Sequence, residues 1–239
     1  MRLVTWNIHK GIGGADRRYS LGRIQTVLAE LAPDLICMQE VAFDMKRLKA
    51  HDQAHLLAEG FPDHTAFFQP TVHWKKGGGY GNVILSRWPI VEQHRISLQH
   101  GIKKPRGAQL AVIETPSGLL RLVHWHLGLT EVERMYQVDH LLRHDLWRQG
   151  AHHPTLLVGD TNDWRNRLGA AFLEPEGLHQ ATAPPSRFRS FPAWMPALSL
   201  DKLFHTPNLS ISHAHAVKSQ ATRQASDHLP VMAEVDWAG

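Results

Sequence analysis

The chain opens with a strand, a helix and a second strand, and this order constrains the fold more than any other feature. Residues 3–8 form a short run of β-favouring residues, which the Gly-rich residues 11–14 then break. Behind Ser20 as a candidate cap, apolar residues recur at helical spacing: Leu21, Ile24, Val27, Leu28 and Leu31. A proline stops this helix, and residues 35–39 predict the next strand. We therefore expect an α/β protein.

The rest of the chain adds strands and one more long helix. Short β-type runs predict strands at 65–68, 82–86, 109–114, 119–124, 155–158, 209–214 and 230–235. The turn residues 116–118 predict a hairpin, so antiparallel pairs join the parallel unit. A helix starting near Thr130 is expected to bury a stripe made of Val132, Met135, Val138, Leu142 and Leu146. Residues 181–196, rich in Pro, Ser and Arg, predict a long surface loop.

Composition narrows the class of protein. The 239 residues are 43% hydrophobic and 20% charged, which suits one large α/β domain spanning residues 1–239. The formal charge of +4 fits an anionic substrate without requiring one. The single cysteine, Cys37, lies in an apolar run, which predicts a reduced cytoplasmic protein with a buried thiol. No stretch approaches the ~18 apolar residues of a membrane span, and we expect neither a signal peptide nor membrane insertion.

Polar residues follow strand after strand. The most specific case is the sequence GDTND at 159–163, directly after the apolar run 155–158. If the strand stays extended, Asp160 and Asn162 share a face, although the same residues also suit an ordinary turn. Further polar residues lie at other strand ends: Asn7, Glu40, His126, Asp201, Asp227 and His228. Because α/β sheets bind ligands outside strand ends, this repetition predicts one polar site.

The residue types indicate the chemistry. Carboxylate and amide oxygens without clustered cysteines favour a hard cation, Mg²⁺ or Mn²⁺, and such an ion suits a phosphate substrate. An acid such as Asp160 could orient or deprotonate water, and a histidine paired with an acid could stabilise the transition state. His228 and Asp201 are the candidate pair, although they are distant in sequence.

Seven motifs, in order, resemble those of the endonuclease/exonuclease/phosphatase family. They are TWNIH at 5–9, LICMQE at 35–40, GNVILSR at 81–87, VHWHL at 123–127, GDTN at 159–162, LDKL at 200–203 and SDHLPV at 226–231. The resemblance implies a four-layer α/β sandwich, with two packed mixed sheets flanked by helices. It also implies a hydrolase of phosphoester bonds, since the family includes nucleases, inositol polyphosphate phosphatases and sphingomyelinases.

The resemblance also implies a role for each motif residue. Glu40 would be the principal Mg²⁺ ligand, supported by Asn7 and Asp227. Asp160 would activate water, and Asn162 would hold the water or the phosphate. His228 would contact the scissile phosphate with Asp201 orienting its ring, and His126 would assist. Thr161 stands where the family usually has Phe, which concerns packing and leaves the functional side chains intact.

The substrate is less constrained than the chemistry. Asn82 and Arg106 are candidates for the phosphate-binding wall. Cations that could follow a nucleic-acid backbone, or simply be solvated, are Lys75, Lys76, Lys103, Lys104, Arg165, Arg167, Arg187 and Arg189. Trp74, Trp164 and Trp194 could stack bases or form core or groove walls. We expect a phosphodiesterase acting on DNA or RNA, with no obligate protein partner. The alternatives are hydrolysis of a lipid headgroup or small phosphoester, and binding without turnover.

Overall fold

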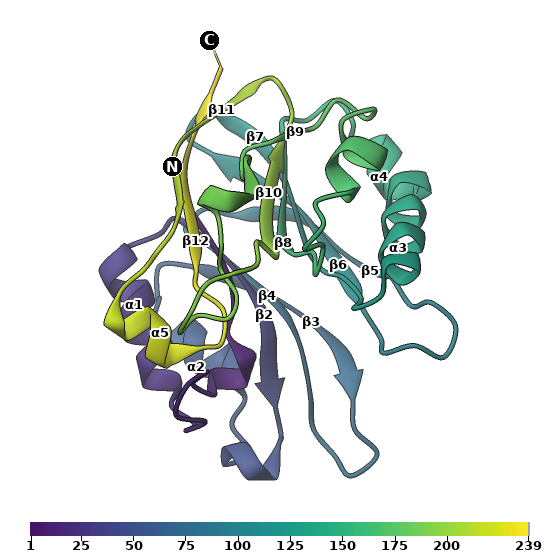
Figure 1. Cartoon of the computed structure of the whole chain (residues 1–239). Helices are drawn as coiled ribbons and strands as arrows, with labels where there is room; N and C mark the ends of the chain where they lie inside the picture. Colours follow the sequence, from purple (N-terminus) through teal and green to yellow (C-terminus); the bar gives the residue numbers. More distant parts are fainter. Residues whose placement is uncertain (239) are drawn as a thin grey trace.

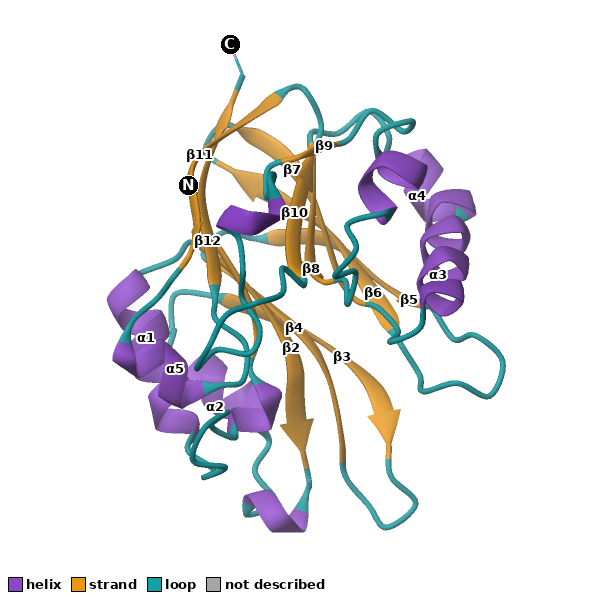
Figure 2. Ribbon diagram, in the orientation of Figure 1, coloured by secondary structure: helices purple, strands orange, loops and turns teal. Residues whose placement is uncertain are grey.

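The computed structural model describes residues 1–238. Two six-stranded sheets pack face to face, and helices cover the outer face of each sheet, as Figures 1 and 2 show. Each sheet contains one parallel pair among antiparallel ones: β1 (Arg2–Asn7) with β2 (Leu35–Phe43), and β7 (Gly118–His126) with β8 (Thr155–Asp160). The predicted α/β sandwich of two mixed sheets is therefore confirmed.

The first sheet has the order β11-β12-β1-β2-β4-β3. Its strands, in chain order, are β1 (Arg2–Asn7), β2 (Leu35–Phe43), β3 (Thr65–His73), β4 (Gly79–Ser86), β11 (Leu209–Ala216) and β12 (Val231–Trp237). The parallel register of β1 and β2 sets Asn7 beside Gln39. The end of β1 is thus adjacent to Glu40.

The second sheet has the order β5-β6-β7-β8-β10-β9. Its strands are β5 (Ile90–Ser97), β6 (Gly107–Thr115), β7 (Gly118–His126), β8 (Thr155–Asp160), β9 (His179–Gln180) and β10 (Asp201–His205). The register sets Asp160 between His126 on β7 and Asp201 on β10. Three candidate site residues from distant segments thereby meet in one row across the sheet.

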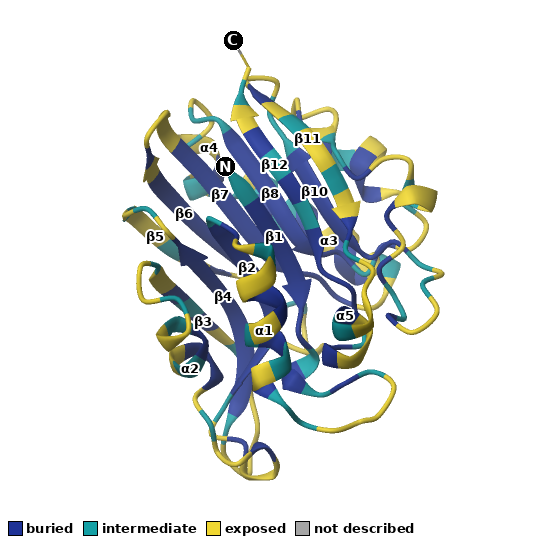
Figure 3. Ribbon diagram, turned by 90° about the vertical axis from the view of Figure 1, so that its left-hand side faces the viewer, coloured by how far each residue is buried: buried dark blue, intermediate teal, exposed yellow. Residues whose placement is uncertain are grey.

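Alternation of side chains along the strands builds three apolar layers. Leu3 and Leu35 of the first sheet pack against Leu122 and Leu156 of the second, and this layer is the core between the sheets. Figure 3 shows the strands as largely buried, while the outer faces of the helices are exposed. The interior is therefore continuous across both sheets.

The helices are α1 (Leu21–Leu31), α2 (Gln53–Glu59), α3 (Glu131–Arg143), α4 (Asp145–Gln149) and α5 (Gln220–Ala225). Residues of α1, α2 and α5 pack on the outer face of the first sheet, whereas α3 and α4 pack on the second. Within residues 1–238, no helix combines the length and apolar character needed to cross a membrane.

Several expectations about local structure were wrong. Val132 and Met135 are 70% and 42% exposed, whereas Val138 is buried as predicted. The helix α3 also buries Leu141 and Gln137, because it packs partly over polar loop backbone, where Gln137 donates to Leu98 O. Leu146 belongs to the separate helix α4. The short or largely polar elements were not predicted from the sequence: β5, β9, β10, α2 and α5. Residues 181–196 contain a 3-10 turn, Pro185–Arg187, within the expected loop.

Candidate active site

Asp160 lies at the centre of a buried polar cluster at one end of the sandwich. Its Oδ2 atom accepts a hydrogen bond from Asn7 Nδ2 at 3.0 Å. The same oxygen lies 3.5 Å from Nε2 of His126 and 3.8 Å from Nε2 of His228. Burial, together with the neighbouring Asp201, raises the pKa of Asp160. One carboxylate thus joins side chains from β1, β7 and the segment before β12.

Gly159 lets Asp160 take this position. The φ angle of Gly159 is 137°, a conformation that side-chain-bearing residues rarely adopt. A Cβ atom there would lie 2.0 Å from the carbonyl oxygen of Trp125 on β7. The glycine of the GDTND motif is therefore required by close strand packing directly before the functional acid.

His228 is held by an acid on each side of its ring. Nδ1 lies 2.8 Å from Oδ2 of Asp201, and Ser190 Oγ donates to that same oxygen at 2.5 Å. Trp6 Nε1 donates to the backbone oxygen of His228 at 2.8 Å. Burial opposes the charge on His228, but Asp201 and Asp160 outweigh it and raise its pKa to about 10. The ring is therefore a fixed cation near neutral pH.

His126 is buried but neutral. Arg106 Nη1 lies 3.2 Å from its Nδ1, and because a guanidinium only donates, Nδ1 accepts and Nε2 carries the proton. Burial, followed by the charge of Arg106, holds the pKa of His126 well below its usual value. Asn82 donates to the backbone oxygen of Gly107 at 3.1 Å, so it anchors the residue after Arg106. The cluster therefore contains one charged and one neutral histidine.

The remaining candidate residues gather around the short turn His9–Gly11. The backbone nitrogen of His9 donates to Asn7 Oδ1 at 3.0 Å, and its Nδ1 lies 3.6 Å from Oδ2 of Asp227. Lys10 forms an ion pair with Glu40, and its charge outweighs burial and lowers the pKa of Glu40. One turn thus contacts all three expected metal ligands.

The donor set of Asn7, Glu40 and Asp227 fits a hard divalent cation. It offers carboxylate and amide oxygens and no sulfur. The side chains of Glu40 and Asp227 are 15% and 25% exposed, so an ion can reach them from solvent. The Lys10 ammonium now supplies positive charge beside Glu40, and the His9 ring lies beside Asp227.

Two geometric expectations about the site were wrong. Glu40 does not end its strand, because β2 continues to Phe43 through a bulge in which Glu40 has a φ of 58°. Asn162 does not share an extended face with Asp160, since its φ is 51° and its backbone nitrogen donates to Asp160 Oδ1 at 2.9 Å. Asn162 Nδ2 donates instead to Leu127 O. The bulge and the turn re-aim these side chains.

Several residues of the site were missed by sequence reasoning. Lys10, His9 and Ser190 contact candidate residues directly, as described above. Nζ of Lys10 and Nζ of Lys104 lie 4.8 Å and 5.2 Å from the centre of the buried Tyr80 ring. The motif around residues 7–11 was visible in the sequence, but nothing in it indicated a pairing between Lys10 and Glu40.

Other polar residues near the site are structural. His124 bridges the two sheets, with Nε2 2.6 Å from Gln39 Nε2 and Nδ1 2.9 Å from Gln109 Oε1. Gln137 accepts from Gly128 N and donates to Leu98 O, and Arg134 donates to Leu129 O. These two side chains fix the loop before α3. The roles of Gln137 and Arg134 are therefore to anchor this loop and not to contact substrate.

The structure brings the predicted residues together in two adjoining groups. Asp160, Asp201 and His228 have ligand atoms within 4.8 Å of one another, and His126 and Asn162 contact Asp160 or its neighbours. Asn7 joins this group to the turn that contacts Glu40 and Asp227. Acid, amide and histidine groups so arranged can bind a cation, polarise a phosphate and move a proton.

Comparison with known proteins identifies the family. The model of the Endonuclease/Exonuclease/phosphatase family matches residues 4–228. The chain belongs to this family. A similar protein, the uncharacterised YbhP of Escherichia coli strain K12, is 29% identical over 250 residues, which cover 98% of this chain and 95% of YbhP.

Solved structures of the family share the fold. An endonuclease/exonuclease/phosphatase from Beutenbergia cavernae superposes with a TM-score of 0.84 at 24% identity, over 100% of this chain and 72% of that one. Mannosyl-6-phosphatase Bt3783 of Bacteroides thetaiotaomicron gives 0.77 at 18% identity, over 99% and 100%. The human nocturnin catalytic domain gives 0.78 at 20%, over 100% and 93%. Family membership identifies the chain as a phosphoester hydrolase in the broad sense.

Proposed function

We propose that this protein is a divalent-metal-dependent phosphodiesterase that cleaves nucleic acid. The arrangement of groups around Asp160 carries the proposal: one buried carboxylate oxygen faces Asn7, His126 and His228, and Asp201 holds His228 from behind. A binding protein would gain nothing from burying two acids against one histidine, because burial of charge is costly unless the charges serve a purpose.

Glu40, Asn7 and Asp227 are the residues proposed to hold Mg²⁺ or Mn²⁺. When bound there, such an ion neutralises phosphate charge and stabilises the leaving oxygen. The exposed fraction of Glu40 and Asp227 supports access from solvent, and the oxygen-only donor set supports a hard cation.

Asp160 is proposed to orient the attacking water and accept its proton. The neutral His126 and the amide of Asn7 hold the Asp160 carboxylate in place through Oδ2. Asn162 is proposed to position the water or a phosphate oxygen from the adjoining turn. His228 donates a hydrogen bond to the scissile phosphate through Nε2, while Asp201 keeps the ring charged and fixed.

Arg106 is proposed as a supporting cation on the phosphate side. Arg106 is only 5% exposed and contacts His126. It is therefore proposed to act through its positive electrostatic potential at the site and not by direct contact with substrate at the surface. Asn82 is proposed to hold that segment through Gly107. Lys10 and Lys104, around Tyr80, add positive potential that favours an anionic substrate.

A small phosphoester is the second candidate substrate. One structural neighbour, Bt3783, bears the name of a mannosyl-6-phosphatase. The cluster of cations around Glu40 would also suit the higher charge of a phosphate monoester. We further propose that residues 1–239 fold as one domain and that the buried thiol of Cys37 belongs to a reducing cytoplasm.

The experiment compares hydrolysis of bis-p-nitrophenyl phosphate, p-nitrophenyl phosphate, single-stranded DNA and RNA, and phospholipid vesicles, each with Mg²⁺, Mn²⁺ or EDTA. We expect metal-dependent cleavage of the diesters, abolished by EDTA. Asp160→Asn should lower kcat by about 10³-fold, within the range for loss of a general base. No cleavage of any substrate with either metal would refute the proposal.

Asp163→Asn is the matched control for Asp160→Asn. Asp163 is also a buried carboxylate of the GDTND motif, but it accepts a hydrogen bond from Leu168 N at 2.9 Å and does not contact the cluster. We expect a lower melting temperature with activity within tenfold of wild type. Equal loss of kcat in both variants, with equal loss of stability, would assign Asp160 a structural role.

A further inference from the structure

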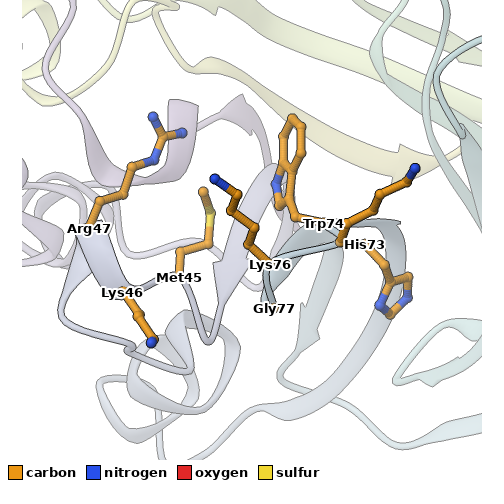
Figure 4. Close-up of a pocket in the computed structure, with 8 residues that line it drawn as sticks. Met45, Lys46, Arg47, His73, Trp74, Lys76 and Gly77 are labelled. Carbon is orange, nitrogen blue, oxygen red and sulfur yellow. The ribbon is translucent and has the colours of Figure 1, made fainter.

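A groove lies between two segments that the mechanism does not use. One wall is the tip of the β3–β4 hairpin, and the other is the segment that follows β2. Its volume is about 760 Å³, and its lining includes Met45, Lys46, Arg47, Trp74, Lys75 and Lys76 (Figure 4). The groove therefore combines an aromatic ring with a concentration of cations.

The cations of this groove have no acidic partners. Across residues 1–238, no carboxylate lies within 4.0 Å of the charged nitrogens of Lys46, Arg47, Lys75 or Lys76. By contrast, Arg165 and Arg167 both pair with Glu131. The groove therefore carries uncompensated positive charge, which attracts a polyanion.

The hairpin presents Trp74 in a defined position. Trp74 N donates to Gly78 O and Gly77 N donates to Trp74 O, each at 2.9 Å, so the tip is a closed turn. Gly78 has a φ of 70°, and a Cβ there would lie 2.5 Å from the backbone oxygen of Asp44. The two walls are thus in contact. Trp74 is 45% exposed, so part of its ring is accessible from solvent.

A short chain of contacts links the groove to the metal half of the site. Met45 packs in one apolar cluster with the buried ring of Tyr80. Lys10 Nζ lies 4.8 Å from the centre of that ring and pairs with Glu40. Two side chains, Tyr80 and Lys10, therefore connect Met45 of the groove to Glu40.

We propose that this groove binds a single-stranded segment of nucleic acid next to the phosphate that is cleaved. The inference rests on the proposed function and deepens it. A base stacks on Trp74, and the four cations neutralise the flanking phosphates without reading sequence. An unstacked base is needed for this contact, so the groove selects single strands over duplex.

Trp74 lines a hollow with Met45 and Lys76 (Figure 4). A hollow of this volume with an aromatic wall suits a nucleotide-sized group.

The first experiment measures binding without turnover. Fluorescence anisotropy follows a labelled single strand of about ten nucleotides in EDTA, with wild type, Trp74→Ala and Trp74→Phe. Loss of one stacked base should weaken binding about tenfold in Trp74→Ala, while Trp74→Phe should stay within about threefold of wild type. Equal affinities for wild type and Trp74→Ala would overturn the proposal.

The second experiment tests the cations. Lys75→Glu/Lys76→Glu should weaken binding by tenfold or more and reduce the slope of log affinity against log salt by about 0.7 for each phosphate that is no longer neutralised. The matched control, Arg143→Glu/Arg148→Glu, makes the same change of charge on exposed residues of α3 and α4 and should bind nearly as wild type. Equal weakening in both would show only a net-charge effect and would overturn the site.

Two further results separate the groove from the proposed catalysis. The groove variants should keep wild-type kcat/KM for bis-p-nitrophenyl phosphate, which is too small to span the groove, while KM for the oligonucleotide rises about tenfold. If Trp74→Ala loses binding but the protein cleaves no substrate, the proposed function is refuted and the proposed binding groove is supported. If phosphatidylserine vesicles or duplex DNA bind more tightly than the single strand, the proposal that the groove binds single-stranded nucleic acid is refuted, and the proposed catalytic function is unaffected.

Discussion

The two halves of the site differ in how their charges are satisfied. In the Asp160 half, acids and histidines bond to one another and are almost fully buried: Asp160, Asp201 and His228 are 1%, 0% and 5% exposed. In the Glu40 half, the acids are partly exposed and face Lys10 and His9, which belong to a turn. The first half is satisfied by bonds among its own acids and histidines, whereas the second holds partly exposed acids beside a turn.

This difference in burial and bonding determines which half an external ion can enter. An ion that entered the Asp160 half would have to displace the strong bonds to His228 and Asn7 and would face a cation. In the Glu40 half, it would compete with Lys10 for Glu40 and with the backbone nitrogen of His9 for Asn7 Oδ1. We therefore expect an ion to enter the Glu40 half, called here the exchangeable half, while the Asp160 half keeps its bonds and is called the fixed half.

The largest effect is expected from the fixed half. Asp201→Asn and His228→Gln should each lower kcat/KM for bis-p-nitrophenyl phosphate by about 100-fold, because Asp201 acts by keeping His228 charged and oriented. The double variant should lose no more than the worse single variant, since residues that act as a unit are not additive. If the loss of kcat/KM in the double variant equals the product of the two single losses, Asp201 and His228 have independent roles and do not act as a pair.

A smaller effect, on the free energy of unfolding, is expected from His124, which bridges the two sheets. Burial lowers the pKa of His124 to about 3, so its neutral form is favoured in the folded state. The folded protein cannot accept the proton that the unfolded chain takes up below about 6.5, so stability is lost as pH falls from there towards 3. This group should account for about 2 kcal/mol between pH 7.5 and 5.0.

The check is urea unfolding at both pH values, with His124→Gln as the comparison. The variant should be less stable at pH 7.5, because it disturbs the link between Gln39 and Gln109, but its stability should depend less on pH. A gap between wild type and variant that stays constant from pH 7.5 to 5.0 would contradict this assignment of the acid sensitivity.

The smallest effect is expected from the exchangeable half. Lys10→Met removes the cation that pairs with Glu40, so half-saturation by Mg²⁺ should occur at about tenfold lower concentration. The metal-free variant should melt at a lower temperature, because Glu40 then lacks a partner. Lys104→Met is the control, as Lys104 also lies over Tyr80 but forms no ion pair with Glu40. A higher Mg²⁺ requirement in Lys10→Met would show that Lys10 assists, and does not compete with, the ion.

Sequence reasoning located residues that follow strong apolar runs. The run before Asp160 fixes the strand, and Gly159 fixes the approach to β7, so the position of Asp160 followed from local pattern. Family resemblance supplied the companions that periodicity alone could not choose among eighteen histidines. The α/β class followed because strand and helix periods differ clearly over most of the chain, whereas the four-layer sandwich was implied by the family resemblance.

Features that depend on a partner strand or a local dihedral could not be predicted in this way. The bulge at Glu40 arises because Met38 pairs with Val83 while Val41 pairs with Gly81, a register that only the assembled sheet defines. The Lys10 contact needs a positive φ of 61° in a turn. Both lie in the exchangeable half, where side-chain direction is set by irregular backbone and not by strand alternation.

The most direct test of the two-halves account is a crystal structure with Mn²⁺, in which anomalous scattering locates the ion. We expect one peak at the Glu40 carboxylate, with Asn7 and Asp227 nearby, Lys10 displaced, and the bond between His228 and Asp201 intact. A peak enclosed by Asp160, Asp201 and His228, with Lys10 still paired to Glu40, would contradict it.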